Sequence, residues 1–457
     1  MMGKRAADGG RATAAMMVAL LVAIIAGFSG CGGSGGGGST TASNPTPAPT
    51  PALPQACSGQ SLVGIDPVNN IGYVSIYALD GAGNGQLALV DLTIGAANPV
   101  LQAISLTGSI EPLAVVYNPA SQTMLAAAAD ADGNVNVYVI PTASRAVASV
   151  VAATGLAYTG SSGGIIEDVA TNNAYVAGTN SFGVLDTSKN PPVWHPETVI
   201  TLSINTDSYT INSTTGWLFV SNAGANSIVD TTKAPFTEIG FVGDQNEQGA
   251  NGTAFDVHTN VVIQSENDRA DAAYAYNFTT LDLTPTPAEA DYVLIPGLGT
   301  LPPVGNGPGG MLTINCTTHQ AIIADDFGQN FKLMQMPKVP PPGPLDNNGQ
   351  PGSGTHADAA SIYTIAAAII PKGIVNGTPT QLGAFDYPSS LAVDPARNLA
   401  YMLADTNPNP HIWTPGDPTP LFLVREDLSN PVFGASPTGG VDGKTFWNPT
   451  GAAIPMP

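Results

Sequence analysis

The chain has 457 residues, of which 43% are hydrophobic and 10% charged, and it is rich in Gly (52) and Pro (40). This is enough apolar material for a large core, and the many turn-forming residues favour short strands joined by turns. With 34 acidic and 13 basic residues, the formal net charge is −21. Electrostatic attraction therefore has the wrong sign for nucleic acid or anionic lipid, so we expect no nucleic-acid partner.

The first 30 residues have the three parts of a secretory signal peptide. Basic residues precede an apolar run over residues 14–28, which is short for a membrane span, and small residues follow it. Residues 28–31 (Phe-Ser-Gly-Cys) resemble the bacterial lipobox, although Phe28 replaces the usual Leu. The resemblance implies that Cys31 is lipidated and begins the mature protein. Ordinary cleavage and an uncleaved span are the alternatives.

A linker over residues 31–56 follows the signal peptide. Its Gly/Ser tract is typical of loose coil, and its Pro/Thr tract favours stiffer polyproline II. We therefore expect an exported protein, periplasmic or on the outer surface, that is held to a membrane by the lipid anchor alone. Export would place Cys57 and Cys316 in an oxidising compartment, where either a disulfide or two buried thiols are possible.

A short unit recurs along the remaining chain, 57–457. In each copy an apolar run ends in Asp or Asn, a polar turn follows, and a second apolar run begins seven positions after that acid or amide. Asp and Asn cap tight turns with their own side chains, so each unit predicts a β-hairpin. The Asp or Asn of each copy is called its anchor, and the seven anchors are Asp66, Asn118, Asp168, Asn212, Asp256, Asn315 and Asp394.

Further apolar segments extend these hairpins. Third strands are predicted over residues 89–93, 184–187, 228–231 and 280–284, and fourth strands over 146–151, 238–242 and 361–365. Four strands per unit predict an all-β fold, a seven-bladed β-propeller of four-stranded antiparallel blades. Because one blade cannot bury both of its faces, the ring must close, and we expect residues 421–424 or 446–447 to pair with the first blade. The Pro- and Gly-rich stretch 337–358 predicts an inserted loop.

The repeat resembles a known family. The succession of an apolar-Asp-Pro end (Asp66-Pro67), a Tyr-Val strand (Tyr73-Val74) and Val-Ile-Asp-Thr-like strands is similar to the YVTN family of bacterial surface β-propellers. That family is related in architecture to the seven-bladed, lactonase-like propellers. The resemblance implies a scaffold and carries little catalytic content. Val257 and Cys316 depart from the pattern, where Pro is expected, and Gln264 departs at an apolar strand position.

Acidic residues are predicted to gather at one mouth of the propeller. Loops that join the second to the third strand of a blade, and the fourth strand to the next blade, share one face. Hard carboxylate oxygens suit Ca²⁺. The candidate ligands are Glu111, Asp244, Glu266, Asp268, Asp325, Asp326, Asp386 and Asp405. The alternative is that Asp is common in loops because it forms turns, and residues 130–134 are expected to form such a hairpin turn because they lack the later Glu of a calcium loop.

Other motifs give little support for chemistry. Residues 160–164 fit a nucleophile elbow but lead into a strand. The five histidines lack paired metal-ligand spacing, and His258 and His319 fall in first turns of their units, so we interpret them as surface turn residues. We therefore favour a monomeric, non-catalytic module that binds a protein, a glycan or a small neutral or cationic ligand. The alternative is a Ca²⁺-assisted, lactonase-like hydrolase in which one mouth carboxylate acts as general base.

Overall fold

The computed structural model divides the chain into two compact units, Met1–Ala52 and Leu53–Pro457. The first unit, with the predicted signal peptide and Cys31, lies outside the described residues. The structure describes residues 61–76, 79–93, 100–160, 163–222, 225–242, 252–265, 273–278, 283, 293–295, 312–325, 330–337, 364–369, 372–375, 378–381, 383–384, 391–405, 421–429 and 444–447. The whole predicted linker and nearly all of the predicted inserted loop therefore lie outside this set.

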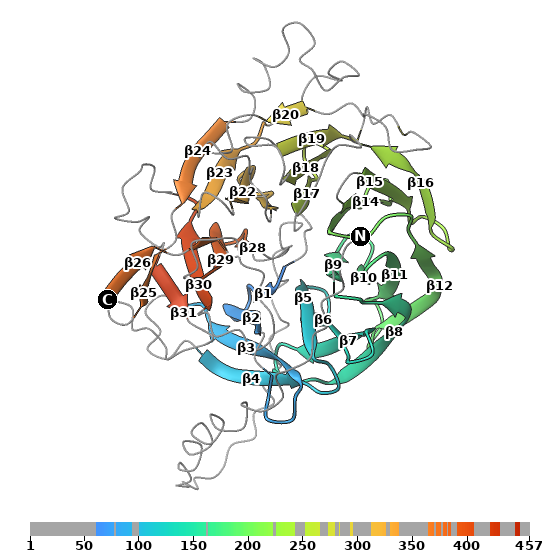
Figure 1. The fold of residues 1–457 in the computed structure, drawn as a ribbon, viewed down its shortest axis with the longest axis horizontal. Helices are drawn as coiled ribbons and strands as arrows, with labels where there is room; N and C mark the ends of the chain where they lie inside the picture. Colours follow the sequence, from blue (N-terminus) through green and yellow to red (C-terminus); the bar gives the residue numbers. More distant parts are fainter. Residues whose placement is uncertain are drawn as a thin grey trace, which may run out of the picture. The chain divides into compact units, whose positions relative to one another are not determined.

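The second unit is a seven-bladed β-propeller of four-stranded antiparallel blades, as predicted (Figure 1). Blades one and two comprise β1 (Val63–Asp66), β2 (Ile71–Ile76), β3 (Gly85–Asp91), β4 (Val100–Leu106), β5 (Glu111–Asn118), β6 (Thr123–Ala129), β7 (Asn134–Pro141) and β8 (Ser149–Ala157). Blades three and four comprise β9 (Gly164–Asp168), β10 (Asn173–Ala177), β11 (Ser181–Asp186), β12 (Val193–Thr201), β13 (Ser208–Asn212), β14 (Trp217–Asn222), β15 (Ala225–Asp230) and β16 (Thr237–Val242).

The remaining blades follow the same order. Blades five and six comprise β17 (Gly252–Asp256), β18 (Val261–Ser265), β19 (Ala273–Asn277), β20 (Val293–Ile295), β21 (Leu312–Asn315), β22 (Gln320–Asp325), β23 (Asn330–Gln335) and β24 (Thr364–Ile369). Blade seven comprises β28 (Leu391–Asp394), β29 (Leu399–Asp405), β30 (Leu421–Asp427) and β31 (Lys444–Trp447). Its sheet is extended by β25 (Lys372–Val375), β26 (Thr378–Gln381) and β27 (Gly383–Ala384).

We label the four strands of each blade a to d, from the centre of the ring outward (Figure 1). Because the strands alternate in direction, the a–b and c–d turns share one face, which we call the turn face. The b–c and d–a connections share the opposite face, which we call the mouth face. Hydrogen bonds join these connections, since Ile110 N–H donates to the Ala129 carbonyl and Asp207 N–H donates to the Ser221 carbonyl.

All seven a–b turns have one construction. The anchor Asp or Asn ends strand a, and its Oδ1 accepts a hydrogen bond from a backbone N–H two or three positions later. A residue with positive φ follows four positions after each anchor, and its carbonyl accepts a hydrogen bond from the residue just after strand c. These positive-φ residues are Asn70, Gln122, Asn172, Gly216, Asn260, His319 and Asn398. The sequence offset of seven therefore marks a tight, left-handed turn in every blade.

The predicted third strand of blade five is wrong. Its strand c is β19, whereas residues 280–284 were expected, and Leu283 is not in a strand. Asn277, the last residue of β19, pairs with the first residue of β18, which is where Asp91 and Asp230 sit in blades one and four. Leu281-Asp282 has the same apolar-Asp pattern as the strand ends of other blades, and this pattern led to the wrong prediction. Ala275 and Tyr276 of β19 are both buried, and they pair with Ile263 and Val262 of β18.

The ring closes without exchange of strands, so the expected pairing of residues 421–424 or 446–447 with blade one is wrong. Both segments lie in blade seven, where β30 pairs with β29 and β31. Closure depends on packing instead, because Val63 and Val90 of blade one share one buried cluster with Tyr401 and Leu423 of blade seven. Each large apolar side chain buried in this way contributes roughly 1.5–3 kcal/mol.

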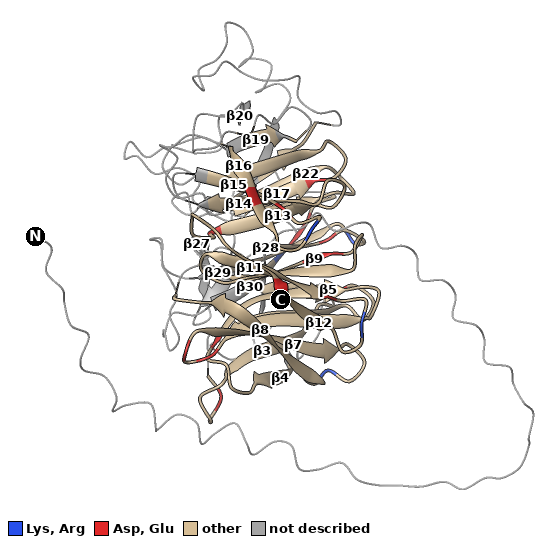
Figure 2. Ribbon diagram, turned by 90° about the vertical axis from the view of Figure 1, so that its right-hand side faces the viewer, with Lys and Arg blue, Asp and Glu red and all other residues tan. Residues whose placement is uncertain are grey.

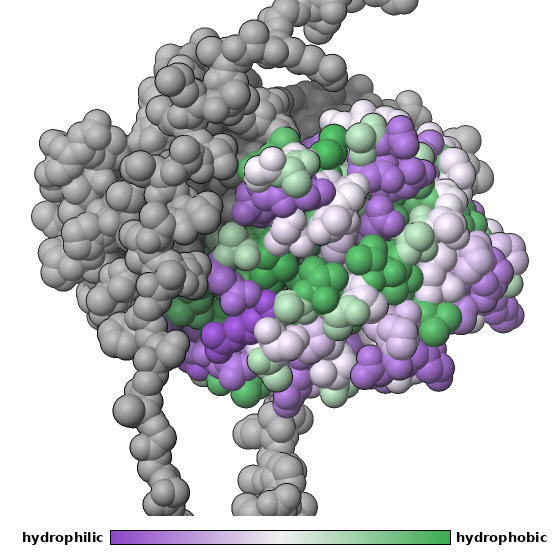
Figure 3. Space-filling model, turned by 90° about the horizontal axis from the view of Figure 1, so that it is seen from below, coloured by the Kyte–Doolittle hydropathy of each residue, from purple (hydrophilic) through white to green (hydrophobic). Residues whose placement is uncertain are grey.

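Similar apolar clusters fill the other blade boundaries. Tyr73 of blade one packs with Met124 and Tyr138 of blade two, and Phe182 of blade three packs edge-on against Tyr209 of blade four. Apolar side chains also reach the outer surface near β4 and β8, where they are exposed between polar ones (Figure 3). Across the described residues, no helix is long and apolar enough to span a membrane.

The second and third cysteines were predicted to form either a disulfide or two buried thiols. Cys316 is buried and disulfide-bonded. Its partner lies outside the described residues, and Cys31 and Cys57 are the other two cysteines of the sequence. The alternative of a buried free thiol at Cys316 is therefore wrong.

Candidate functional site

Most of the predicted calcium ligands lie outside the described residues. This applies to Asp244, Glu266, Asp268, Asp326 and Asp386. Asp325 and Asp405 end the b strands β22 and β29, at the mouth face as expected, but only their backbones are described. Glu111 is the one predicted ligand with a described side chain. The calcium site therefore stays a prediction.

Glu111 begins β5 and is half-buried at the mouth face. Its Oε1 accepts a hydrogen bond of 2.7 Å from the hydroxyl of Tyr158, which follows β8 of the same blade. The Tyr158 ring is buried. This contact ties the first and last strands of blade two together beside the mouth. Within the described ranges, no group of three or more His, Cys, Asp or Glu is placed to hold a metal ion.

Two mouth-face loops use their acidic side chains to hold their own backbone. In blade two, Asp130 Oδ1 accepts hydrogen bonds from the backbone N–H groups of Asp132 and Asn134, and Asn134 Nδ2 donates to Oδ2. These bonds, the largest from the Asn134 side chain, lower the pKa of Asp130. Residues 130–134 thus form a hairpin turn between β6 and β7, as predicted.

The b–c loop of blade one repeats this construction. Asp80 Oδ1 accepts hydrogen bonds from the backbone of Ala82 and Asn84, and Asn84 Nδ2 donates to the same carboxylate. The Ser105 hydroxyl also donates to Asp80, and this bond is the largest cause of its lowered pKa. Each loop has a glycine with positive φ before its Asn, Gly83 in blade one and Gly133 in blade two. Both loops are therefore held in one shape by their own side chains.

Charge is distributed unequally between the two faces. Arg145, Lys189, Lys233 and Arg397, the described basic side chains outside strands, all lie in a–b or c–d turns and so on the turn face. The basic segments lie along one side of the edge-on propeller, where acidic segments such as those near β9 and β22 also lie, and acidic loops near β3 and β4 lie on the other side (Figure 2). The mouth face, as far as its side chains are described, is acidic and neutral.

On the turn face, polar side chains connect neighbouring blades. In most cases the anchor Asp or Asn, or a residue of the same turn, reaches the a–b turn of the next blade. The contacts in blade order are Asn118 Nδ2 to Glu167 Oε1 (3.0 Å), Ser213 Oγ to Asp168 Oδ1 (2.7 Å), Asn212 Nδ2 to Asn260 Oδ1 (2.8 Å), His319 Nδ1 to Asp256 Oδ2 (3.7 Å), Asn315 Nδ2 to Asn398 Oδ1 (2.6 Å) and Arg397 Nη2 to the Pro67 carbonyl (2.9 Å). We call this set the turn-face ring.

One carboxyl of the turn-face ring is unusual. Glu167 is buried between blades two and three, and its Oε1 accepts hydrogen bonds from Asn118 Nδ2 and from the Thr187 hydroxyl. The pKa of Glu167 is raised to about 8, mainly by burial and in smaller part by the neighbouring Asp168, although the Thr187 hydrogen bond lowers it. Its Oε2 atom has no hydrogen-bond partner in the described part of the chain. The protonated carboxyl is therefore the form that this site favours near neutral pH.

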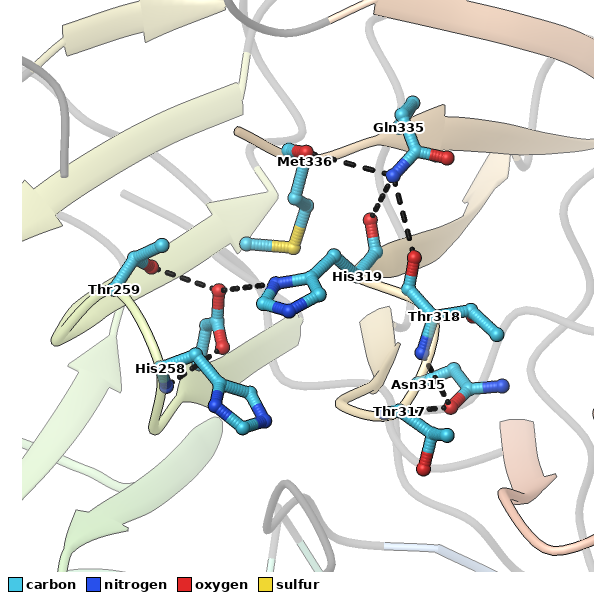
Figure 4. A network of polar contacts seen from close by, with 9 residues as sticks. His258, Thr259, Asn315, Thr317, Thr318, His319, Gln335 and Met336 are labelled. Atoms are coloured by element: carbon cyan, nitrogen blue, oxygen red, sulfur yellow. Dashed lines mark hydrogen bonds and ion pairs between the residues drawn. The ribbon is translucent and has the colours of Figure 1, made fainter. Parts of the chain in front are cut away.

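Two histidines meet at the boundary of blades five and six (Figure 4). The ring centroids of His258 and His319 are 4.7 Å apart, and the planes are inclined by 45°. His319 Nδ1 faces the fully buried Asp256 carboxylate at 3.7 Å. That carboxylate also accepts hydrogen bonds from the backbone N–H of His258 and from the hydroxyl of Thr259. Two imidazoles and one carboxylate from adjacent blades thus lie together.

Sequence reasoning placed both histidines in turns correctly but missed that they meet. His258 is exposed, whereas His319 is only 19% exposed and its Nδ1 is buried. If the a–b turns are aligned on their anchors, the sequence does predict that the two histidines lie close together. His258 lies two positions after one anchor and His319 lies four positions after the next, so consecutive blades place them on facing turns.

No protein-family model and no curated protein matches the chain. Several solved structures are similar to this chain. A putative 6-phosphogluconolactonase from Bacteroides uniformis is 11% identical with a TM-score of 0.43, over 60% of this chain and 80% of that one. Hydrazine synthase of Kuenenia stuttgartiensis is 13% identical (TM-score 0.44; 78% and 94%), and a hypothetical selenium-binding protein from Sulfolobus tokodaii is 11% identical (0.45; 81% and 89%). At these identities the similarity concerns the fold alone.

Proposed function

We propose that the protein is an exported cell-envelope β-propeller that acts as a non-catalytic binding module through its mouth face. Its partner is a protein, a glycan or a small neutral or cationic ligand. The signal-like N-terminus, the lipobox-like residues 28–31 and the resemblance of the repeat to YVTN surface propellers support export and anchoring. The chain acts as a monomer in this proposal, since its seven blades complete the ring without a strand from a second copy.

The observation that carries this proposal is the construction of the mouth-face loops of blades one and two. Asp80 and Asp130 hold their own loops in a fixed shape, so a partner that docks there encounters a surface that is already ordered. Binding to an ordered surface costs less conformational entropy than binding to one that must order on contact. Rigid scaffolds that present such loops are the common arrangement of binding proteins.

The same face offers apolar contact area next to acidic groups. Leu79 and Ile110, from adjacent connections of blade one, are 44% and 41% exposed. Glu111 follows Ile110 directly, and Asp132 is exposed in the loop of blade two. A basic or neutral partner with an apolar surface suits this combination, since an acidic partner would be repelled.

Arrays of glycans and of basic peptides test the binding proposal. We expect the purified mature protein to retain a ligand, and the variant Leu79→Ser/Ile110→Ser/Asp132→Asn to bind it at least tenfold more weakly with an unchanged melting temperature. Val193→Ser, on the outer strand β12, is the matched control because Val193 is similarly exposed. Undiminished binding by the mouth variant would contradict the proposal, as would turnover of a lactone.

Membrane fractionation tests the anchor separately. We expect the wild-type protein in the membrane fraction and Cys31→Ala in the soluble envelope fraction, because a lipidated cysteine is what would hold the mature chain. Cys57→Ala is the control for the loss of a cysteine: lipidation of Cys31 leaves Cys57 as the partner of Cys316, so this variant also loses the disulfide but should stay in the membrane fraction. If Cys31→Ala stays with the membrane, the lipid anchor is wrong, whatever the outcome of the binding arrays.

A further inference from the structure

The seven a–b turns provide an internal reference for what this turn requires. Four of the seven residues with positive φ are Asn, which tolerates that conformation well. Blade six has His319 there instead, and blade five has His258 at a position where blades four and six have Thr214 and Thr317. Neither turn needs a histidine to fold. The two departures nevertheless fall on facing turns of adjacent blades.

The separation of the rings fits a shared metal ion. A metal about 2.0–2.1 Å from one nitrogen of each imidazole would place the ring centroids roughly 4.5–5.2 Å apart, for angles between octahedral and tetrahedral. The observed separation is 4.7 Å. His258 is exposed, so its ring is free to turn toward the ion, and solvent can reach the site.

The carboxylate of Asp256 orients the His319 ring. Its carboxylate faces Nδ1 of His319, which leaves Nε2 of that ring for a metal. Metal-binding histidines commonly have such a carboxylate behind them, because it fixes the ring and makes the ligating nitrogen more basic. The Asp256 carboxylate is itself held in place by hydrogen bonds from the Thr259 hydroxyl and the backbone N–H of His258.

We propose that His258 and His319 bind a divalent transition metal of the Zn²⁺, Ni²⁺ or Cu²⁺ class across the boundary of blades five and six, with Asp256 as a positioning residue. Imidazole prefers these ions, whereas Ca²⁺ prefers oxygen ligands. The described residues supply these two imidazole ligands, and water can occupy further positions of the ion. The ion would clamp two blades together and would leave positions open for an external ligand.

Calorimetric titration with ZnCl₂ and NiCl₂ tests the proposal on the full mature protein, prepared with an affinity tag that lacks histidine. Because Thr and Asn occupy the equivalent positions of other blades, His258→Thr and His319→Asn should fold. We expect each variant to bind at least tenfold more weakly and to lose the rise in melting temperature that the metal causes in the wild type. His195→Ala, on the outer strand of blade three, should bind as the wild type does.

Two results would overturn the site: no heat of binding at millimolar metal, or equal binding by the wild type and His258→Thr. Asp256→Asn tests the positioning role, because Asn caps the same turn at Asn212 and Asn315. We expect an affinity about tenfold lower at an unchanged melting temperature without metal. Unchanged affinity in Asp256→Asn would remove Asp256 from the proposal.

Discussion

On the mouth face, Asp80 and Asp130 bind the backbone of their own loops, whereas on the turn face Asp168 accepts a hydrogen bond from Ser213 of the next blade. The residue type is the same, and the position in the blade differs. The a–b turns follow the innermost strands, where neighbouring blades are closest, so their side chains reach across the boundary (Figure 1). The b–c loops lie further out. The anchors of the turn face therefore hold their own turns and also, as at Asp168, bind the next blade, whereas Asp80 and Asp130 bind residues of their own blades.

We expect the largest loss of stability from a substitution that distorts the mouth-face loop of blade two. A Cβ atom at Gly133 would lie 2.4 Å from the Tyr158 carbonyl oxygen, and φ there is +81°. We expect Gly133→Ala to lower the free energy of unfolding by about 3 kcal/mol, since strain and a backbone clash add. Gly83→Ala is the matched control in blade one, with φ +85° and open space, and should cost about 1 kcal/mol. Equal losses in urea unfolding would contradict this account.

The next effect breaks the turn-face ring where it closes. Arg397 binds the buried Asp394 carboxylate at 2.6 Å and the Pro67 carbonyl of blade one at 2.9 Å. Arg397→Ala should lower the free energy of unfolding by about 2 kcal/mol, because hydrogen bonds to a buried charge are lost. Lys189→Ala, which removes an exposed ion pair of 3.6 Å with Asp186, should cost about 0.5 kcal/mol or less. Similar losses in both variants would show that closure does not depend on Arg397.

Glu167 gives a prediction of opposite sign. Because burial raises its pKa from 4.5 to about 8, the unfolded chain releases this proton at lower pH than the folded chain does. Each rise in pH between these values therefore favours unfolding. Glu167→Gln keeps an acceptor for Asn118 and Thr187 and should raise the free energy of unfolding by about 2 kcal/mol at pH 8, with little change at pH 4. The free energy of unfolding is measured by urea unfolding at several pH values from 4 to 8. The same pH dependence in the wild type and in Glu167→Gln would refute the role of burial.

The smallest expected effect sharpens the comparison at the mouth. A bound Ca²⁺ at 100 times its Kd would add about 2.7 kcal/mol to the free energy of unfolding. We expect no such gain from Glu111 or Asp130 when Ca²⁺ replaces EDTA, because both already have hydrogen-bond partners, in Tyr158 and Asn134. Calorimetric melting measures this directly. A clear rise would revive the calcium-assisted hydrolase, and lactone turnover would then decide between catalysis and structural calcium.

Local sequence identified the a–b turns well. Asp and Asn cap a turn through bonds to residues two or three positions away, and such bonds need no distant partner, so the seven anchors could be read from the chain. The third strand of blade five could not be read in this way. Residues 281–282 and Asn277 both offer a plausible strand end, and only pairing with β18 selects Asn277. The same limit applies to His258 and His319, whose meeting depends on a blade boundary.

The sequence by itself determined the number of blades, the place of each anchor and the acidic character of the chain, because these follow from composition and from contacts a few residues apart. Tertiary structure alone decided how the ring closes, which side chains meet between blades, and that Glu167 is buried. Those properties come from packing between segments that are distant in the chain, and local patterns carry no information about which neighbour a side chain will face.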